Sequence, residues 1–219
     1  KTTTVNLITG VLSKTEGTVE FDGKDISNLP THKIARCGIG RTFQNIKVFP
    51  TMTLLENIMV GGHEITKMGI IRGVFASYLE DCGVDGLHVS RAVHLKDEYM
   101  KNLPYGRQKI SEIGRAMMTD PKLILLDEPA AGLNPSERAE LVKVITRSYD
   151  EGYSFFLIEH NMDVVMKISD YITVLSFGKE IAEGKPEEIQ KNPEVIRAYL
   201  GSAYLKQEER DKQAEESKQ

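Results

Sequence analysis

Cysteine is scarce in these 219 residues. Cys37 and Cys82 stand far apart, with neither the CxxC spacing nor the paired Cys and His residues of a metal knuckle. Two distant cysteines without such a motif favour free thiols in a reducing compartment. We therefore expect neither a disulfide framework nor a cysteine-bound metal cluster.

Long hydrophobic runs and a strong charge of one sign are also absent. The longest apolar runs, such as LILL and FFLI, are strand-sized, whereas a membrane-spanning helix requires about 18 apolar residues. Lysine and arginine number 28 against 32 aspartates and glutamates, so the net charge is only −4. This balance gives no global field that would attract nucleic acid or an anionic membrane surface.

The apolar segments that are present indicate a parallel α/β sheet. Two of them, 122–129 (KLILLDEP) and 153–160 (YSFFLIEH), have the length of strands. Between them, Asn134 can cap a helix, Glu137 completes a capping box and Gly152 ends the helix. Strand, helix and strand form a βαβ unit, and uninterrupted apolar strands imply burial on both faces of a parallel sheet.

The chain divides into three regions by composition. From about residue 66 to 118, helical segments broken by glycines predict a smaller helical lobe inserted into the sheet domain. The sheet domain then comprises residues 1–65 and 119–205, and its last part includes a predicted hairpin turning near Gly178. Residues 206–219 contain almost no apolar side chains, so we expect a solvated tail.

The chain begins KTTTVNLITG, which is typical of a phosphate-binding loop's second half. Val5, Ile8 and Leu12 recur at helical spacing, and the alternating residues TVEFDG after Gly17 predict a strand. A helix that starts with lysine and threonine attracts phosphate at its N-terminus.

Polar side chains follow the two apolar strands. Asp127 and Glu128 end the first strand and His160 ends the second, and open α/β sheets bind ligands at the carboxyl ends of their strands. In a phosphate site, Asp127 can hold Mg²⁺ and Glu128 can polarise an attacking water. From LILLDEP alone, a pair of solvated loop carboxylates remains an alternative, as does a structural role for His160.

Four motifs in order resemble those of the ABC-type ATPases. LPYGRQKISEIGRAMMTDPKLILLDEPAAGLNP is similar to the family's signature, Walker B and D-loop block. GIGRTFQNIKVFPTMTLLENIMVG is similar to its Q-loop, with Gln44, and LIEHNMDVV to its switch segment, with His160. The forms YGRQK, EPAAGLNP and NPEVIRAYLG further resemble the ATPase of branched-chain amino-acid importers. The expected fold is therefore an ABC-type P-loop NTPase.

This resemblance implies a site for ATP and Mg²⁺ near the start of the chain. Lys1 matches the Walker A lysine that neutralises phosphate charge, Thr2 the Mg²⁺-binding hydroxyl and Thr3 a phosphate contact. The family's glycine loop, its strand and an adenine-stacking aromatic would precede Lys1. We expect that strand beside segment 122–129, and weak ATP binding by a chain without it.

The resemblance also assigns the residues of hydrolysis. Asp127 and Gln44 would hold Mg²⁺ together with Thr2, Glu128 would act as the general base, and His160 would read the γ-phosphate. Gln44 as an ordinary loop residue is the alternative.

The family's ATPases form a sandwich dimer in which the signature motif of one subunit covers the ATP of the other. The residues expected to close over the partner's ATP are Leu103, Pro104, Tyr105, Gly106, Arg107 and Gln108.

Several residues depart from the family pattern. Pro104 replaces a serine that contacts the γ-phosphate, Arg107 offers positive charge in place of glutamine, and Asn134 replaces the D-loop aspartate. We expect Tyr105 to pack and not to stack on a nucleotide. The basic residues 107, 109 and 115 interleave with Glu112, so we expect a solvated helix face and no nucleic-acid strip.

The function implied is ATP hydrolysis coupled to import of branched-chain amino acids. The implied partners are a second ABC ATPase subunit in a homodimer or heterodimer, permease subunits at the cytoplasmic face of the cell membrane, and indirectly a substrate-binding protein. Two alternatives stay open. One is a non-transport ABC ATPase acting on DNA or ribosomes, which would be expected to carry coiled-coil arms or a second cassette, and the other is an inactive fragment.

Overall fold

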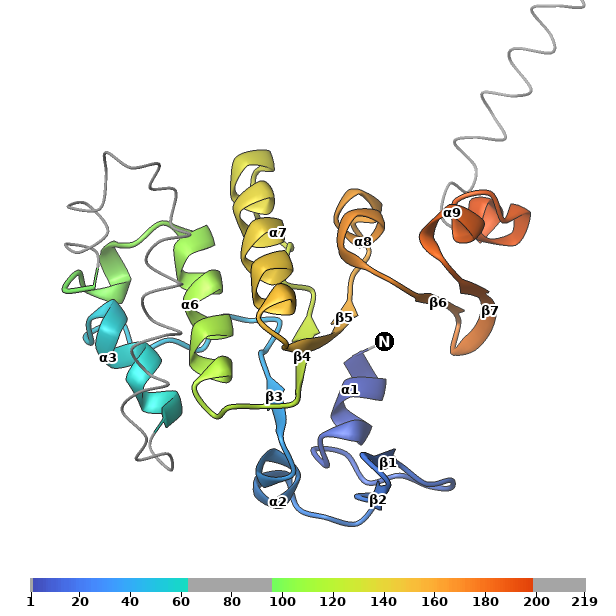
Figure 1. Cartoon of the computed structure of the whole chain (residues 1–219), viewed down its shortest axis with the longest axis horizontal. Helices are drawn as coiled ribbons and strands as arrows, with labels where there is room; N and C mark the ends of the chain where they lie inside the picture. Colours follow the sequence, from blue (N-terminus) through green and yellow to red (C-terminus); the bar gives the residue numbers. More distant parts are fainter. Residues whose placement is uncertain (1, 63–95, 199–219) are drawn as a thin grey trace, which may run out of the picture. The chain divides into compact units, whose positions relative to one another are not determined.

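The computed structural model describes residues 2–62 and 96–198 (Figure 1). These residues belong to two compact units, one comprising Thr2–Val164 and the other beginning at Val165. The helices and strands of the larger unit are α1 (Thr2–Ile8), β1 (Glu20–Phe21), β2 (Lys24–Asp25), α2 (Thr31–Arg36), β3 (Ile39–Arg41), α3 (Leu54–Met59), η1 (Val60–Gly62), η2 (Met100–Asn102), α6 (Tyr105–Met117), β4 (Leu123–Asp127), α7 (Pro135–Asp150) and β5 (Ser154–Ile158). Helix α8 (Met162–Ile168) spans the boundary, and β6 (Ile172–Ser176), β7 (Lys179–Gly184) and α9 (Pro186–Ile189) follow it.

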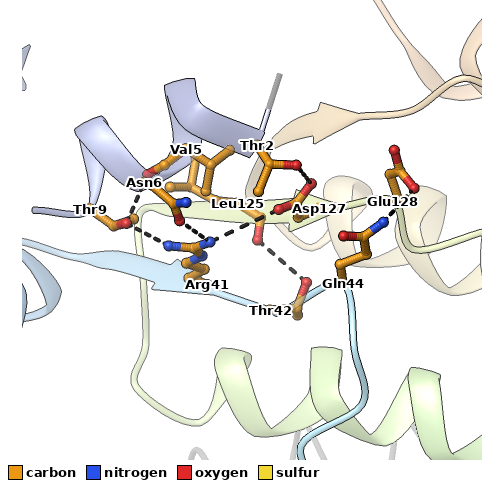
Figure 2. Close-up of polar contacts among 10 residues, drawn as sticks. All are labelled: Thr2, Val5, Asn6, Thr9, Arg41, Thr42, Gln44, Leu125, Asp127 and Glu128. Carbon is orange, nitrogen blue, oxygen red and sulfur yellow. Dashed lines mark hydrogen bonds and ion pairs between the residues drawn. The ribbon is translucent and has the colours of Figure 1, made fainter. Parts of the chain in front are cut away.

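Three parallel strands form the sheet that positions the site. Their order is β3, β4, β5, so the central strand β4 is paired on both sides. Ile124, Leu125 and Leu126 are fully buried, as expected for a strand covered on both faces. Helix α1 lies on one side of these strands and α6 on the other (Figures 1 and 2). The predicted α/β class with a parallel sheet is confirmed.

Strand β5 departs from the burial expected on both faces. Its side chains alternate in burial, and Phe156 is 40% exposed. Within the described residues β5 pairs only with β4, so it forms an edge of the sheet. The position expected for a further strand beside segment 122–129 is wrong, because β3 and β5 already occupy both sides of β4.

Helix α7 begins and ends as predicted. Asn134 Oδ1 accepts a hydrogen bond from the Glu137 backbone, and the Glu137 carboxylate accepts one from the Asn134 backbone, both at 3.0 Å. The helix ends at Asp150, and Gly152 follows with a φ of 101° that favours glycine. The connection from β4 to β5 is therefore the expected βαβ unit.

Helix α1 packs on the sheet but is shorter than its apolar spacing predicted. Val5 is fully buried in a cluster with Ile34 and Leu125. The helix ends at Ile8, and Gly10 then adopts a left-handed φ of 67°, which leaves Leu12 exposed. Burial of Val5 fixes the first turn of α1 near β4.

The part of the predicted helical lobe that is described consists of 96–118. Here η2 leads into α6, and α3 and η1 pack against α6. Residues 66–95 of the predicted lobe lie outside the described residues, so the lobe and its boundaries remain a prediction.

The smaller unit contains the predicted hairpin. Strands β6 and β7 pair antiparallel, and Phe177 and Gly178 both take positive φ in the turn. Its core joins Val174 to Ile189 and Val195. The predicted tail 206–219 lies outside the described residues. None of the described helices is long and apolar enough to cross a membrane.

Candidate nucleotide site

Polar residues gather at the carboxyl ends of the three parallel strands, and Figure 2 shows those that belong to β3, β4 and the loops after them. Asp127 is the last residue of β4, and Glu128 follows it with a φ of 49°. Gln44 comes three residues after β3, and His160 two residues after β5. Parallel strands end at the same edge of a sheet, so the three connections meet there.

Asp127 lies at the buried centre of this group. It is 1% exposed, and the Thr2 hydroxyl donates to its Oδ1 at 3.4 Å. Burial raises the pKa of Asp127, and the Arg41 guanidinium, 3.9 Å from Oδ2, opposes that rise. The carboxylate therefore presents one oxygen to Thr2 and the other to Arg41.

Arg41 joins the sheet to α1. Its two terminal nitrogens donate to Thr9 Oγ1 and Asn6 Oδ1, each at 2.7 Å. The guanidinium also lies 4.8 Å from the centre of the Phe43 ring. We did not predict this role from the sequence, although a charged residue at the end of a buried strand was a signal. Arg41 fixes α1, and with it Thr2, against Asp127.

The side chains expected to take part in hydrolysis also meet. Gln44 Nε2 donates to Glu128 Oε2 at 2.9 Å, and His160 Nδ1 lies 3.6 Å from Glu128 Oε1. The structure thus brings Gln44, Glu128 and His160 together, and Glu128 directly follows Asp127, which contacts Thr2. Thr3 is exposed, and Lys1 lies outside the described residues.

Glu159 connects the loops that follow β4 and β5. Its Oε1 accepts from the Ala130 backbone at 2.7 Å, and its Oε2 accepts from the backbones of His160 and Asn161 at 3.0 and 3.2 Å. The Glu128 backbone donates to the carbonyl of Ile158 at 2.8 Å. Sequence reasoning missed Glu159. Its carboxylate binds backbone amides of two loops, and such a role leaves no motif in the sequence.

The signature residues occupy the start of α6. Pro104 is the N-cap and is exposed, as is Tyr105. The Gly106 backbone donates to Glu137 Oε1 at 3.2 Å, and Arg107 lies 3.6 Å from Glu140 Oε1. The remaining two signature residues contact each other, since the Gln108 side-chain amide donates to the carbonyl of Leu103 at 2.9 Å. Gly106 and Arg107 thus face α7 in this chain.

The solvated helix face predicted for α6 is wrong for two of its charged residues. Lys109 is 5% exposed and Glu112 is 4% exposed. Lys109 Nζ donates to the Glu128 carbonyl at 3.0 Å, and Glu112 Oε1 accepts from the Lys47 backbone at 2.6 Å. Burial lowers the pKa of Lys109 and raises that of Glu112. Both side chains bond backbone groups of neighbouring loops, and the spacing of residues along a helix cannot reveal such contacts.

The donor atoms at the site fit a hard cation such as Mg²⁺. Mg²⁺ prefers oxygen ligands, and two neighbouring ligands of its octahedron lie about 3 Å apart. Thr2 Oγ1 and Asp127 Oδ1 are 3.4 Å apart. These two oxygens can therefore share one cation, directly or through water.

Comparison with known proteins identifies the family. The sequence model of the family described as "ABC transporter" matches residues 1–131. The fold is similar to a crystallised ATP-binding cassette of an ABC transporter in its ADP conformation, with a TM-score of 0.76, 31% identity and coverage of 92% of this chain and 84% of that one. A nucleotide-free cassette gives a TM-score of 0.75, 32% identity and coverage of 92% and 83%. The chain belongs to the ABC transporter family and has the fold of its ATPases, as predicted.

Within that family the chain groups with a particular set of subunits. The model described as "Branched-chain amino acid ATP-binding cassette transporter" matches residues 179–204. The chain is 42% identical over 212 residues to the high-affinity branched-chain amino acid transport ATP-binding protein BraF of Pseudomonas aeruginosa. It is 40% identical over 220 residues to LivG of Escherichia coli, a protein with the same description. Each alignment covers 93% of this chain and 83% of the relative.

The contacts of Glu159 generate a stability prediction. Glu159→Gln leaves one acceptor oxygen where the carboxylate has two, so at least one charge-assisted bond is lost. We expect the free energy of unfolding to fall by about 1–3 kcal/mol, with faster hydrogen exchange at the Ala130 amide. Glu16→Gln, which changes an exposed carboxylate, is the control. Unchanged protection of the Ala130 amide would contradict this role.

Proposed function

We propose that this chain is the ATP-hydrolysing subunit of an importer of branched-chain amino acids. The observation that carries the proposal is the meeting of Gln44, Asp127 and Glu128 at one sheet edge. The names of BraF and LivG support this substrate class, and they favour transport over action on DNA or ribosomes.

Glu128 acts as the general base in this proposal. Its carboxylate is held by Gln44 at 2.9 Å and remains partly exposed, so a water molecule can reach it. Glu128 takes a proton from that water as the water attacks the γ-phosphorus and the bond to ADP breaks. His160, 3.6 Å from Glu128, is placed to contact the γ-phosphate.

Thr2, Asp127 and Gln44 hold Mg²⁺ in the proposed site. When bound, the cation neutralises charge that develops on the phosphate oxygens. The separation of 3.4 Å between the Thr2 and Asp127 oxygens supports this assignment, as does the fixing of α1 by Arg41. Lys1 and Thr3 would contact the phosphates of ATP.

We infer that the subunit works as a homodimer or heterodimer with a second ABC ATPase subunit. Exposure of Pro104 and Tyr105 at the start of the 13-residue helix α6 supports the closing of signature residues 103–108 over the partner's ATP. In this arrangement residues 1–65 and 119–205 are the ATP-binding core, and 66–118 is the helical lobe.

Transport requires permease subunits at the cytoplasmic face of the membrane, which a substrate-binding protein would supply with amino acid. Three exposed apolar side chains, Phe49, Met52 and Tyr99, support a docking surface. Phe49 and Met52 share one turn, and Tyr99 lies opposite Thr53 across a β-bridge. Phe49 and Met52 follow Gln44 closely along the chain, so a docked helix of the permease would contact the segment that carries a proposed Mg²⁺ ligand.

The proposed base is tested by Glu128→Gln in the full-length protein. The amide keeps the shape of the side chain but cannot take the proton, so turnover should fall by about 10²–10⁴ while ATP binding is retained. The variant should accumulate as an ATP-bound dimer, which size-exclusion chromatography detects. Wild-type phosphate release by this variant would remove Glu128 from the role.

The docking surface is tested by Phe49→Asp. A charge at the centre of an apolar interface should weaken binding to the permease by about tenfold or more and lower transport to the same extent. Phe177→Asp is the matched control, because Phe177 is also exposed but lies in the turn of the other unit. Crosslinks from the permease that map to the charged tail 206–219, and spare Phe49, would contradict the assignment.

A further inference from the structure

Helix α6 carries two buried charges of opposite sign. Lys109 and Glu112 are 5% and 4% exposed, and their spacing of three residues places them on the same face of the helix. A buried charge is costly unless it is paired and hydrogen-bonded. Neither side chain points to solvent, and each bonds a backbone atom of a different loop.

Lys109 holds the backbone of Glu128. Its Nζ donates to the Glu128 carbonyl at 3.0 Å, while the Glu128 amide donates to the Ile158 carbonyl at 2.8 Å. Glu128 has a φ of 49°, in the left-handed region that residues with a side chain rarely adopt. Such a conformation persists when the surroundings determine it, and here α6 and β5 hold it from two sides.

Glu112 holds the segment that carries Gln44. Its Oε1 accepts from the Lys47 backbone at 2.6 Å, and Arg115 donates to the same oxygen at 3.1 Å. Lys47 is three residues after Gln44 in a connection without helix or strand. The anchored amide therefore limits how far the Gln44 backbone can move from α6.

The two anchored segments meet again at their side chains. Gln44 and Glu128 are joined at 2.9 Å, and the backbone near each is bonded to the same face of α6. We propose that Lys109 and Glu112 are positioning residues through which α6 holds Gln44 and Glu128 in the arrangement needed for hydrolysis. This inference rests on the proposed function, in which Glu128 is the base. It gives helix α6, which begins within the signature motif, a direct contact with Glu128 and another with the segment that follows Gln44.

A purely structural role for the same residues makes a different prediction. Two buried charges that only stabilise the fold would affect activity in proportion to stability, regardless of Gln44. A positioning role predicts loss of turnover without loss of ATP affinity, and dependence of the Glu112 effect on Gln44.

The experiment measures steady-state ATP hydrolysis and unfolding in the full-length protein. Glu112→Met and Lys109→Met remove the two anchors, and Ile113→Val is the control, because it weakens the buried core of the same helix without touching either anchor. We expect each Met variant to lower kcat by about 10- to 100-fold with little change in KM, and Ile113→Val to leave kcat unchanged. In a Gln44→Ala background, Glu112→Met should cause no further loss, whereas Lys109→Met should still lower kcat.

The charge-retaining variants Glu112→Asp and Lys109→Arg cover the case in which a Met variant does not fold. They alter the length of the anchor, and we expect smaller losses of kcat with the same dependence on Gln44. The proposal is overturned if these variants have the same kcat as Ile113→Val at equal loss of stability. It is also overturned if substituting Glu112 lowers kcat as much in the Gln44→Ala background as in the wild type. If Glu128→Gln retains wild-type turnover, the proposed function itself fails, and this inference fails with it.

Discussion

The backbone ladder between β4 and its two neighbours is the interaction on which the site depends. Its register pairs Arg41 with Leu125 on one side and Asp127 with Ile158 on the other. A shift of one residue along either ladder would turn the side chains to the opposite face. With this register, the connections that carry Gln44, Glu128 and His160 leave the same edge of the sheet.

Buried polar contacts then fix helix α1 and the loop after β4 in the positions to which the strand pairing brings them. Asp127 is stabilised by Thr2 and Arg41, which bind α1 to the end of β4. Glu159 and Lys109 hold backbone atoms of the loop that follows β4. Since unsatisfied buried polar groups are costly, these contacts favour one arrangement of the loops over its alternatives.

The sequence predicted those features that arise from local pattern. The capping box of α7, the strands on either side of it and the hairpin near Gly178 follow from short-range periodicity and turn chemistry, and all three are present. The meeting of Gln44 with Glu128 followed from motif resemblance, because the residues are 84 positions apart.

The burial of individual side chains was not predicted, because it depends on which other part of the fold packs against them. Lys109 and Glu112 have the composition of a solvated helix face, and only the loops packed against α6 make them buried. Phe156 lies in β5, whose apolar sequence is like that of β4, but β5 is at an edge of the sheet and Phe156 is exposed. Helical spacing extended α1 to Leu12 because it took no account of the left-handed turn at Gly10.

We propose that Asp127 and Thr2 hold Mg²⁺ for ATP at the end of β4. The most direct measurement is calorimetric ATP binding with Mg²⁺ and with chelator, for the wild type and for Asp127→Asn, which keeps the shape of the side chain. We expect Mg²⁺ to strengthen ATP binding by the wild type, and we expect this increase in affinity to be about tenfold or more smaller in Asp127→Asn. Equal dependence on Mg²⁺ in both proteins would contradict it.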